Sequence, residues 1–319
     1  LRRSKLTFRY HRRRENDRFM NQKTIPLLIL PVIWGSYYVA SHEAARFLSA
    51  FPMGIMIRLV TLILLTVLMW RRGELSLLLR VEGAVRRLLC IGVLGFLLDA
   101  TAFIGLSMAS AGLGTALLKC DILFVNLISV FVYHQKFTKF DWIATFVMLF
   151  GVVLVLGLDP SDLDVMNFGN VFFILSALFV AINAFVIKSV QTDPLNPISD
   201  DVVAYYNNLI TMVLFNIASL VTGHISQLPM VLENSYLAGA LVLSGIGQTL
   251  IYVFYYYNLR RFPVWLVKIF LLLMPIVSAL ISFVLFGETM SVIQCAGIAI
   301  VLVGAIGILA EQRRQEAAK

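Results

Sequence analysis

Long apolar runs alternate with short polar segments along almost the whole chain. Each of ten runs has close to the roughly 20 residues that a helix needs to cross a hydrocarbon core of about 30 Å. The runs cover residues 25–45, 52–70, 88–107, 112–133, 141–158, 169–190, 201–222, 236–258, 263–286 and 291–310. Backbone polar groups cannot stay unpaired in lipid, and the strands of a membrane barrel would alternate between apolar and polar residues. The pattern therefore predicts an all-α membrane protein with ten transmembrane helices.

Composition and charge agree with this prediction. Hydrophobic residues make up 60% of the 319 positions and charged residues only 14%, whereas soluble domains are about 45–50% apolar. Most of the 26 Lys and Arg residues fall in alternate connecting segments, which the positive-inside rule places in the cytosol. We therefore expect both termini in the cytosol and a multi-pass protein of the cytoplasmic membrane, surrounded by the lipid bilayer.

The two ends of the chain are polar. Residues 1–24 are strongly basic and contain no long apolar core, so they do not form a cleavable signal peptide. Since Met20 stands just before the first run, this segment is either a basic cytosolic tail or an artefact of start-site choice. Binding of nucleic acid is not predicted from it. Residues 311–319 are expected to form a cytosolic C-terminal tail.

The two halves of the chain resemble each other. A displacement of 153 residues places FGVVLVL, which contains Gly151, over VGAIGIL, which contains Gly304. This predicts a first five-helix repeat over residues 25–158 and a second over residues 169–310. Because five is an odd number of crossings, the second repeat is inverted relative to the first, as in many secondary transporters.

Several short motifs occur in the order of a known family. They are Trp34-Gly35-Ser36, Arg58, the GLSMASAGLGTALL segment at 105–118, Pro275, Gly287-Glu288 and a glycine-rich last helix. In this set the chain resembles the EamA-type branch of the drug/metabolite transporter superfamily. The resemblance covers about residues 25–310 and implies ten helices in two inverted repeats, with export or exchange of small metabolites.

Three places depart from the pattern of that family. Ile122 stands where the fourth helix usually has proline, and His134-Gln135 replaces the Gly-Glu that follows it. The charged Lys119-Cys120-Asp121 is not part of the general family motif. The resemblance therefore indicates transport but does not indicate the substrate.

Four charged residues lie within about 5 Å of the predicted midplane, at 1.5 Å of rise per residue. They are Arg58, Asp99, Lys119 and Asp121. We expect an ion-pair network in which Arg58 or Lys119 meets Asp99 or Asp121. It would act either as a structural lock or as a gate in which one aspartate couples transport to a proton, because burial and a neighbouring cation shift a carboxyl pKa in opposite directions.

Lys268 differs from these four because the second repeat has no Asp or Glu inside the membrane. We expect its ammonium to have no carboxylate partner. It would then either extend to the headgroups, since Lys268 is only five residues from Pro263, or bind a carboxylate or phosphate of the substrate.

Polar and aromatic side chains on three helices are candidates for the wall of a cavity. They are Tyr206 and Asn207 in the seventh run, Gln248 and Tyr252 in the eighth, and Trp34 and Tyr38 in the first. The segment Tyr205–Asn208 resembles a motif of GDP-sugar transporters. The alternative for all of these side chains is ordinary packing between membrane helices.

The sequence therefore predicts a secondary transporter that works by alternating access. Three intramembrane cations against two carboxylates favour a small zwitterionic or anionic metabolite, such as an amino acid, moved by an exporter or exchanger. The alternatives are an exchanger of nucleotide sugars or organic phosphates, a cationic multidrug exporter and a non-transporting scaffold. A proton is a candidate coupling ion, and the chain is expected to be a monomer or a homodimer.

Enzyme chemistry is not predicted. The four histidines show no spacing typical of a metal site, and the segment GLGTALLK lacks the ending of a phosphate loop. No cofactor or metal is expected.

Overall fold

The computed structural model describes residues 25–108, 117–135, 137–156, 168–287 and 291–317. The predicted basic tail, most of the 105–118 motif and Glu288 lie outside the described residues.

All the regular elements in these ranges are helices, which confirms the all-α prediction. The α-helices are the first helix (Ile25–Ala45), α2 (Ala50–Arg72), α3 (Val85–Met108), α5 (Asp121–Phe131), α6 (Lys139–Val155), α7 (Gly169–Gln191), α8 (Asp200–Val221), α9 (Met230–Glu233), α10 (Ser235–Arg261), α11 (Val264–Leu271), α12 (Met274–Phe286) and α13 (Val292–Ala317). Two 3-10 helices, η1 (Leu75–Leu79) and η3 (His224–Gln227), lie in connections.

Six described helical segments are long and apolar enough to cross a membrane. They are Ile25–Ala45, Ala50–Arg72, Gly169–Gln191, Asp200–Val221, Ser235–Arg261 and Val264–Leu285, and a shorter apolar segment covers Val292–Ile308. The total of ten spans and the cytosolic placement of both termini stay predictions.

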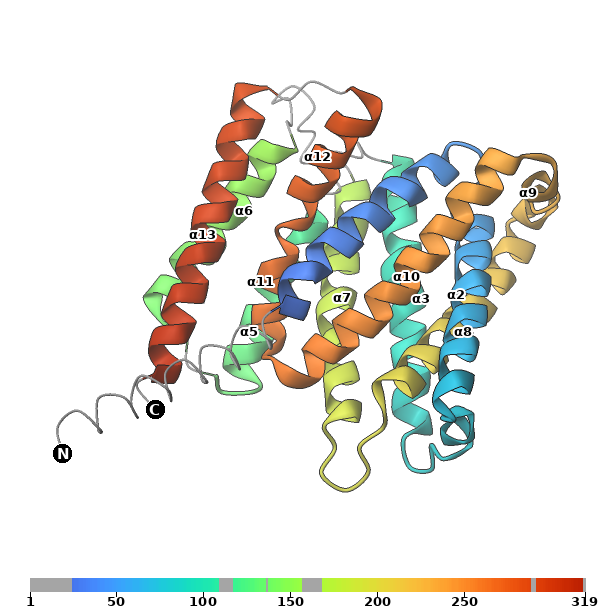
Figure 1. The fold of residues 1–319 in the computed structure, drawn as a ribbon, viewed down its shortest axis with the longest axis horizontal. Helices are drawn as coiled ribbons and strands as arrows, with labels where there is room; N and C mark the ends of the chain where they lie inside the picture. The colour runs from blue at the N-terminus through green and yellow to red at the C-terminus, as the bar shows by residue number, and fades with distance from the viewer. Residues whose placement is uncertain (1–24, 109–116, 136, 157–167, 288–290, 318–319) are drawn as a thin grey trace, which may run out of the picture.

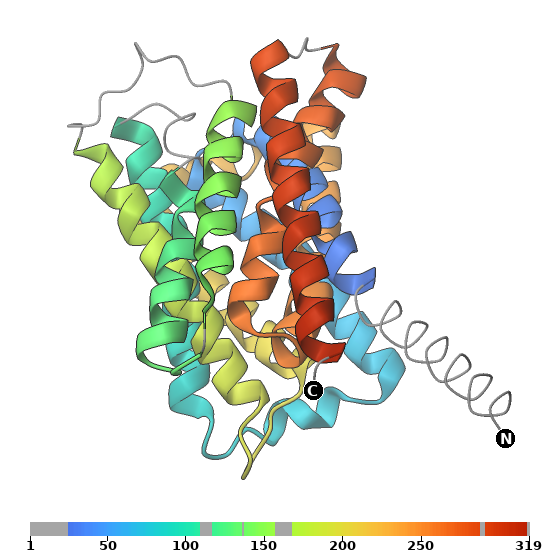
Figure 2. The same ribbon diagram turned by 90° about the vertical axis from the view of Figure 1, so that its left-hand side faces the viewer.

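The helices form one bundle with a clear order from end to end (Figure 1). The α6–α13 pair lies at one end and the α2–α8 pair at the other, and each pair joins one helix from each half of the chain. The first helix and α10 cross one face of the bundle, while α3 packs against α7 behind them. Figure 2 shows α6 and α13 side by side along their length.

Two hydrogen bonds between the halves are reciprocal: in each, a threonine of one half donates to a glycine carbonyl of the other. Thr61 of α2 donates a hydrogen bond to the carbonyl of Gly245 in α10, at 3.2 Å. Thr211 of α8 donates to the carbonyl of Gly92 in α3, at 3.1 Å. Gly92 and Gly245 are 153 residues apart, and the two threonines 150 apart. Such exchange of equivalent contacts is what a two-fold relation between the halves produces.

The run over residues 263–286 was expected to form one helix, but it is divided into α11 and α12. The amides of Leu272 and Leu273 bond to carbonyls three residues back, at Ile269 and Phe270. Pro275 follows in the first turn of α12, where its missing N–H cannot continue the ladder of the preceding helix. The helix therefore breaks near its middle.

In the first half, α5 begins at the position that corresponds to the start of α12 in the second half. Cys120 is in a turn and α5 begins at Asp121, 153 residues before Met274, where α12 begins. Contacts between α5 and α11 bring the two irregular stretches together. Interrupted helices in corresponding positions of two repeats are the best structural indication of a binding site in a secondary transporter.

Candidate functional site

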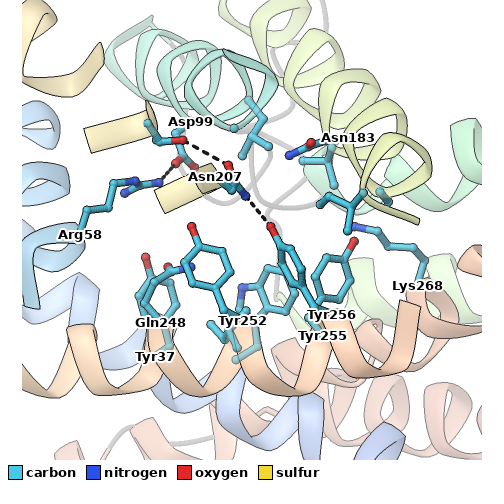
Figure 3. A pocket seen from close by; sticks show the side chains of 18 residues that line it. Tyr37, Arg58, Asp99, Asn183, Asn207, Gln248, Tyr252, Tyr255, Tyr256 and Lys268 are labelled. Atoms are coloured by element: carbon cyan, nitrogen blue, oxygen red, sulfur yellow. Dashed lines mark hydrogen bonds and ion pairs between the residues drawn. The ribbon is translucent and has the colours of Figure 1, made fainter. Parts of the chain in front are cut away.

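A cavity of about 150 Å³ lies in the middle of the bundle. Its wall comes from the first helix, α2 and α3 in the first half and from α7, α8, α10 and α11 in the second. It is lined by Trp34, Tyr37, Arg58, Gly95, Leu98, Asp99, Val180, Asn183, Ala184, Ile187, Asn207, Thr211, Gln248, Ile251, Tyr252, Tyr255, Tyr256 and Lys268. Figure 3 shows its ten labelled polar and aromatic side chains.

One wall of the cavity is a face of α10. Gln248, Tyr252, Tyr255 and Tyr256 recur at spacings of three and four, so they lie on the same side of the helix, and all four line the cavity (Figure 3). Trp34 of the first helix meets Tyr255 edge-on, with 5.4 Å between ring centroids. The wall is therefore aromatic with hydroxyl groups, which suits a small amphipathic ligand.

An ion pair within the first half lies at one side of the cavity. The guanidinium of Arg58 and the carboxylate of Asp99 are 2.5 Å apart, which is one of the pairings that the sequence allowed. Arg58 also lies over the ring of Phe215, 4.6 Å from its centroid. The Asp99 side chain is 28% exposed against 8% for Arg58, so the carboxylate is the more accessible partner.

The expectation of an unpartnered Lys268 was wrong. Its ammonium is 3.0 Å from the carboxylate of Asp121, which belongs to α5 in the other half. The residue is only 3% exposed, so it does not extend to the headgroups either. No Asp or Glu lies inside the membrane in the second repeat by sequence, and the partner comes from the first repeat.

Lys119 is not an ion-pair partner of either aspartate in the described structure. The contact found for its ammonium is the thioether of Met274, at 3.6 Å. Lys119 and Asp121 are two positions apart, and residues at that spacing point to different sides of a helix. Two ammonium groups and one carboxylate are thus gathered where α5 crosses the α11–α12 break, and this cluster has a net positive charge.

The amides of α8 are mostly engaged with other helices. Asn207 lines the cavity and donates from Nδ2 to the Tyr256 hydroxyl at 2.6 Å. Asn208 donates to the carbonyl of Arg58 at 2.9 Å. Tyr206 was expected in the cavity, but its hydroxyl donates to the carbonyl of Leu78, at 2.7 Å, because it lies on the face of α8 turned toward η1.

Asn183 of α7 has an unsatisfied acceptor at the cavity wall. The residue is 5% exposed, and its Oδ1 is buried without a hydrogen-bond partner in the described structure. A buried carbonyl left in this way costs about 1–3 kcal/mol. A water molecule or a donor group of a ligand in the cavity would remove that cost.

A second cavity, of about 580 Å³, lies between the first helix, α6 and α12. Tyr38 lines this cavity and not the central one, contrary to the expectation that Trp34 and Tyr38 enclose the same space. Tyr37 lines the central cavity where Tyr38 was expected. It is three residues from Trp34 whereas Tyr38 is four away, and either spacing keeps two side chains on one helix face, so packing alone decides between them.

Comparison with known proteins identifies the family. The sequence model of the EamA-like transporter family matches residues 23–157 and again residues 167–310. The chain belongs to the EamA-like transporter family. The two matches show that the chain contains two EamA repeats. With the apolar helices they make the chain a multi-pass membrane transporter, in keeping with its expected place in the cytoplasmic membrane.

Two further proteins are similar to this EamA-like transporter. A curated protein of Salmonella typhimurium (strain LT2), named as a probable amino-acid metabolite efflux pump, is 24% identical over 198 residues, which is 61% of this chain and 66% of that protein. The match thus spans slightly less than two thirds of the relative. A solved crystal structure is 18% identical with a TM-score of 0.72, covering 89% of this chain and 96% of its own, and supports the fold.

The central cavity of this EamA-like transporter collects many but not all of the predicted residues. Those that line it are Lys268, Asn207, Gln248, Tyr252, Trp34, Arg58 and Asp99. Tyr206, Tyr38, Asp121 and Lys119 do not line it. Tyr37 and Thr211 were missed. Helical spacing from Trp34 does not separate Tyr37 from the adjacent Tyr38, and a single threonine in an apolar run gives no signal that separates packing from a cavity wall.

Proposed function

We propose that this transporter moves a small zwitterionic or anionic metabolite, such as an amino acid, by alternating access, as an exporter or exchanger of the cytoplasmic membrane. The observation that carries the proposal is the buried Lys268 ammonium at the wall of the central cavity. A charged side chain inside the membrane is expensive and is usually functional. Among the described residues, the Lys268 and Lys119 ammonium groups lie near one carboxylate, that of Asp121, so a ligand carboxylate would neutralise the cluster.

Other groups on the wall suit the rest of an amino acid. The partly exposed carboxylate of Asp99 and the unsatisfied Oδ1 of Asn183 are acceptors for an ammonium group. The tyrosines of α10 offer aromatic surface to an apolar side chain. The probable amino-acid metabolite efflux pump of Salmonella typhimurium supports the same substrate class.

The arrangement of the repeats supports the mechanism. The exchanged contacts Thr61–Gly245 and Thr211–Gly92 fit two halves related by a two-fold axis. A two-fold axis in the membrane plane relates inverted repeats, and alternating access then proceeds by movement of one repeat against the other around a fixed site.

The size and contacts of the site favour this class over nucleotide sugars. Pockets for drug-sized ligands measure about 300–1,000 Å³, whereas the central cavity measures about 150 Å³. Tyr206 and Asn208, which resemble part of a nucleotide-sugar motif, bond to backbone carbonyls of Leu78 and Arg58 instead. A lipophilic cation would meet a net positive wall.

A ligand screen on the purified chain tests the proposal. Each of the twenty standard amino acids, a set of nucleotide sugars and a set of lipophilic cations would be scored for the melting temperature of the protein in detergent. We expect stabilisation by one or more amino acids and none by the other classes. Stabilisation by lipophilic cations alone, or by nucleotide sugars alone, would contradict the proposed substrate class.

A further inference from the structure

We propose that Asp121 is a positioning residue that holds the Lys268 ammonium at the cavity wall and thereby sets the preference of the site for a carboxylate. The inference rests on the proposed function, in which Lys268 binds the substrate carboxylate. It assigns to Asp121 a role in recognition although this residue does not touch the cavity.

Asp121 contacts the Lys268 ammonium without lining the cavity itself. Lys268 lines the cavity and Asp121 does not, yet the two side chains are 3.0 Å apart. The ring of Tyr255 flanks the same ammonium, with its centroid 5.3 Å away. A lysine ammonium has three N–H donors. Asp121 and the Tyr255 side chain each accept one of them, which leaves one donor for a ligand in the cavity.

Without the Asp121 carboxylate, the Lys268 side chain has an alternative orientation, toward the lipid headgroups. Its four-carbon stem is flexible, and Lys268 lies in the second turn of α11, which begins at Val264. A membrane lysine near a helix end tends to extend toward the headgroups. The residue is instead 3% exposed. The carboxylate of Asp121 offsets this tendency by keeping the ammonium within the bundle.

The anchor comes from the opposite repeat. Asp121 begins α5 in the first half, and Lys268 is on α11 in the second. Lys119, just before α5, contacts Met274, the first residue of α12. The start of α5 therefore contacts both sides of the α11–α12 break. The position of the binding ammonium then depends on how the two repeats are placed against each other.

Simple charge counting and positioning predict opposite effects for Asp121→Asn. Removing a negative charge beside an anion site makes the site more positive, which by Coulomb attraction tightens anion binding. If Asp121 positions Lys268, its loss releases the ammonium and weakens the binding of a carboxylate. The sign of the change separates the two accounts.

The experiment uses the full chain in detergent. The ligand is the amino acid that gives the largest melting shift among the twenty, and its decarboxylated amine is the matched control. We expect Asp121→Asn to raise the dissociation constant for the amino acid about tenfold, which is about 1.4 kcal/mol, and to leave that for the amine unchanged. Asp121→Glu, which keeps the carboxylate, should restore amino-acid binding. Unchanged or tighter amino-acid binding by Asp121→Asn overturns the proposal.

A charge exchange separates positioning from stability, and it covers the case in which Asp121→Asn does not fold. The double variant Asp121→Lys with Lys268→Asp keeps the ion pair, so its melting temperature should stay near that of the wild type. The ammonium now belongs to α5 and lies away from the cavity, so amino-acid binding should be lost. A folded double variant with wild-type affinity overturns the proposal.

The outcomes also separate this inference from the proposed function. If no amino acid binds the wild type, the proposed substrate class fails, and the role of Asp121 fails with it. If Lys268→Met abolishes amino-acid binding while Asp121→Asn preserves it, the proposed function stands and only the role of Asp121 fails.

Discussion

Buried polar groups in the middle of the bundle have two kinds of environment. Arg58 and Asp99 pair within one repeat, and Lys268 and Asp121 pair between the repeats. Both pairs reduce the cost of placing charge in a membrane. The Oδ1 atom of Asn183 has no such partner in the described structure. An unsatisfied acceptor at a cavity wall indicates a ligand more strongly than a satisfied ion pair does, because no described group of the protein donates a hydrogen bond to it.

Replacing Asn183 with leucine should separate binding from stability. The change removes the acceptor, so we expect the dissociation constant for an amino-acid ligand to rise about ten- to hundredfold, since hydrogen bonds to charged groups contribute about 1.5–3 kcal/mol. The melting temperature should stay the same or rise, because an unsatisfied polar group is replaced by an apolar one. Calorimetric titration and thermal unfolding measure the two effects.

Asn126 provides a matched control. It is also buried with an unsatisfied Oδ1, but its Nδ2 donates to Thr145 and it does not line the central cavity. Asn126→Leu should change stability and leave the affinity unchanged. Equal loss of affinity in both variants would mean that Asn183 acts through packing.

At the scale of helices, the α6–α13 pair depends on close approach of two backbones. A Cβ atom placed on Gly297 of α13 would lie 2.7 Å from the carbonyl oxygen of Gly151 and 2.7 Å from the amide of Val155. Backbone atoms cannot move aside as a flexible side chain can. Small residues at membrane helix contacts permit such approach, and van der Waals packing then stabilises the pair.

Gly297→Ala should therefore lower the melting temperature by several degrees, because the added methyl group forces α6 and α13 apart. Gly239→Ala in α10 is the control, since no atom of the described residues lies within 4 Å of a Cβ atom placed there. That change should be neutral or slightly stabilising, because alanine favours a helix over glycine by up to about 1 kcal/mol. Similar melting temperatures for the two variants would contradict close packing of α6 against α13.

The apolar pattern predicted the helices better than it predicted their interruptions. Continuous runs identified spans such as Ala50–Arg72 and Gly169–Gln191, since lipid leaves a backbone few other choices. The break before Met274 was missed, although Pro275 offered a local signal. The partner of Lys268 had no local signal at all, because the contact with Asp121 depends on how α5 crosses α11.

At the scale of the whole molecule, two ion pairs connect the repeats at the ends of the helices that lie lowest in Figure 1. Arg72 of α2 pairs with Asp201 of α8, and Arg87 of α3 pairs with Asp193 in the α7–α8 connection. Figure 1 places the α2–α3 and α7–α8 connections at the same end. The amide of Leu195 and the Arg87 guanidinium lower the pKa of Asp193. The Arg87–Asp193 ion pair is therefore lost only when the pH falls through that lowered pKa.

Weakening these two pairs should open that end of the transporter. In a variant without native cysteines and with Val180→Cys in the cavity wall, we expect Asp193→Asn with Asp201→Asn to speed labelling by a membrane-impermeant maleimide. The reason is that each lost pair removes a contact between repeats that an inward-open state must break. The maleimide is added on the side of the membrane that the positive-inside rule predicts for this end, the cytosol. Labelling equally slow with and without the two aspartates would contradict a gate at this end.

The claim on which the account depends is that the Lys268 ammonium binds a carboxylate of a transported metabolite. Proteoliposomes loaded with the amino acid that stabilises the protein most, and diluted into the same labelled amino acid, test it through counterflow. We expect accumulation of label by the wild type and none by Lys268→Met, with the folding of Lys268→Met checked by its melting temperature and its elution in size-exclusion chromatography. Wild-type counterflow by a folded Lys268→Met protein would contradict the account.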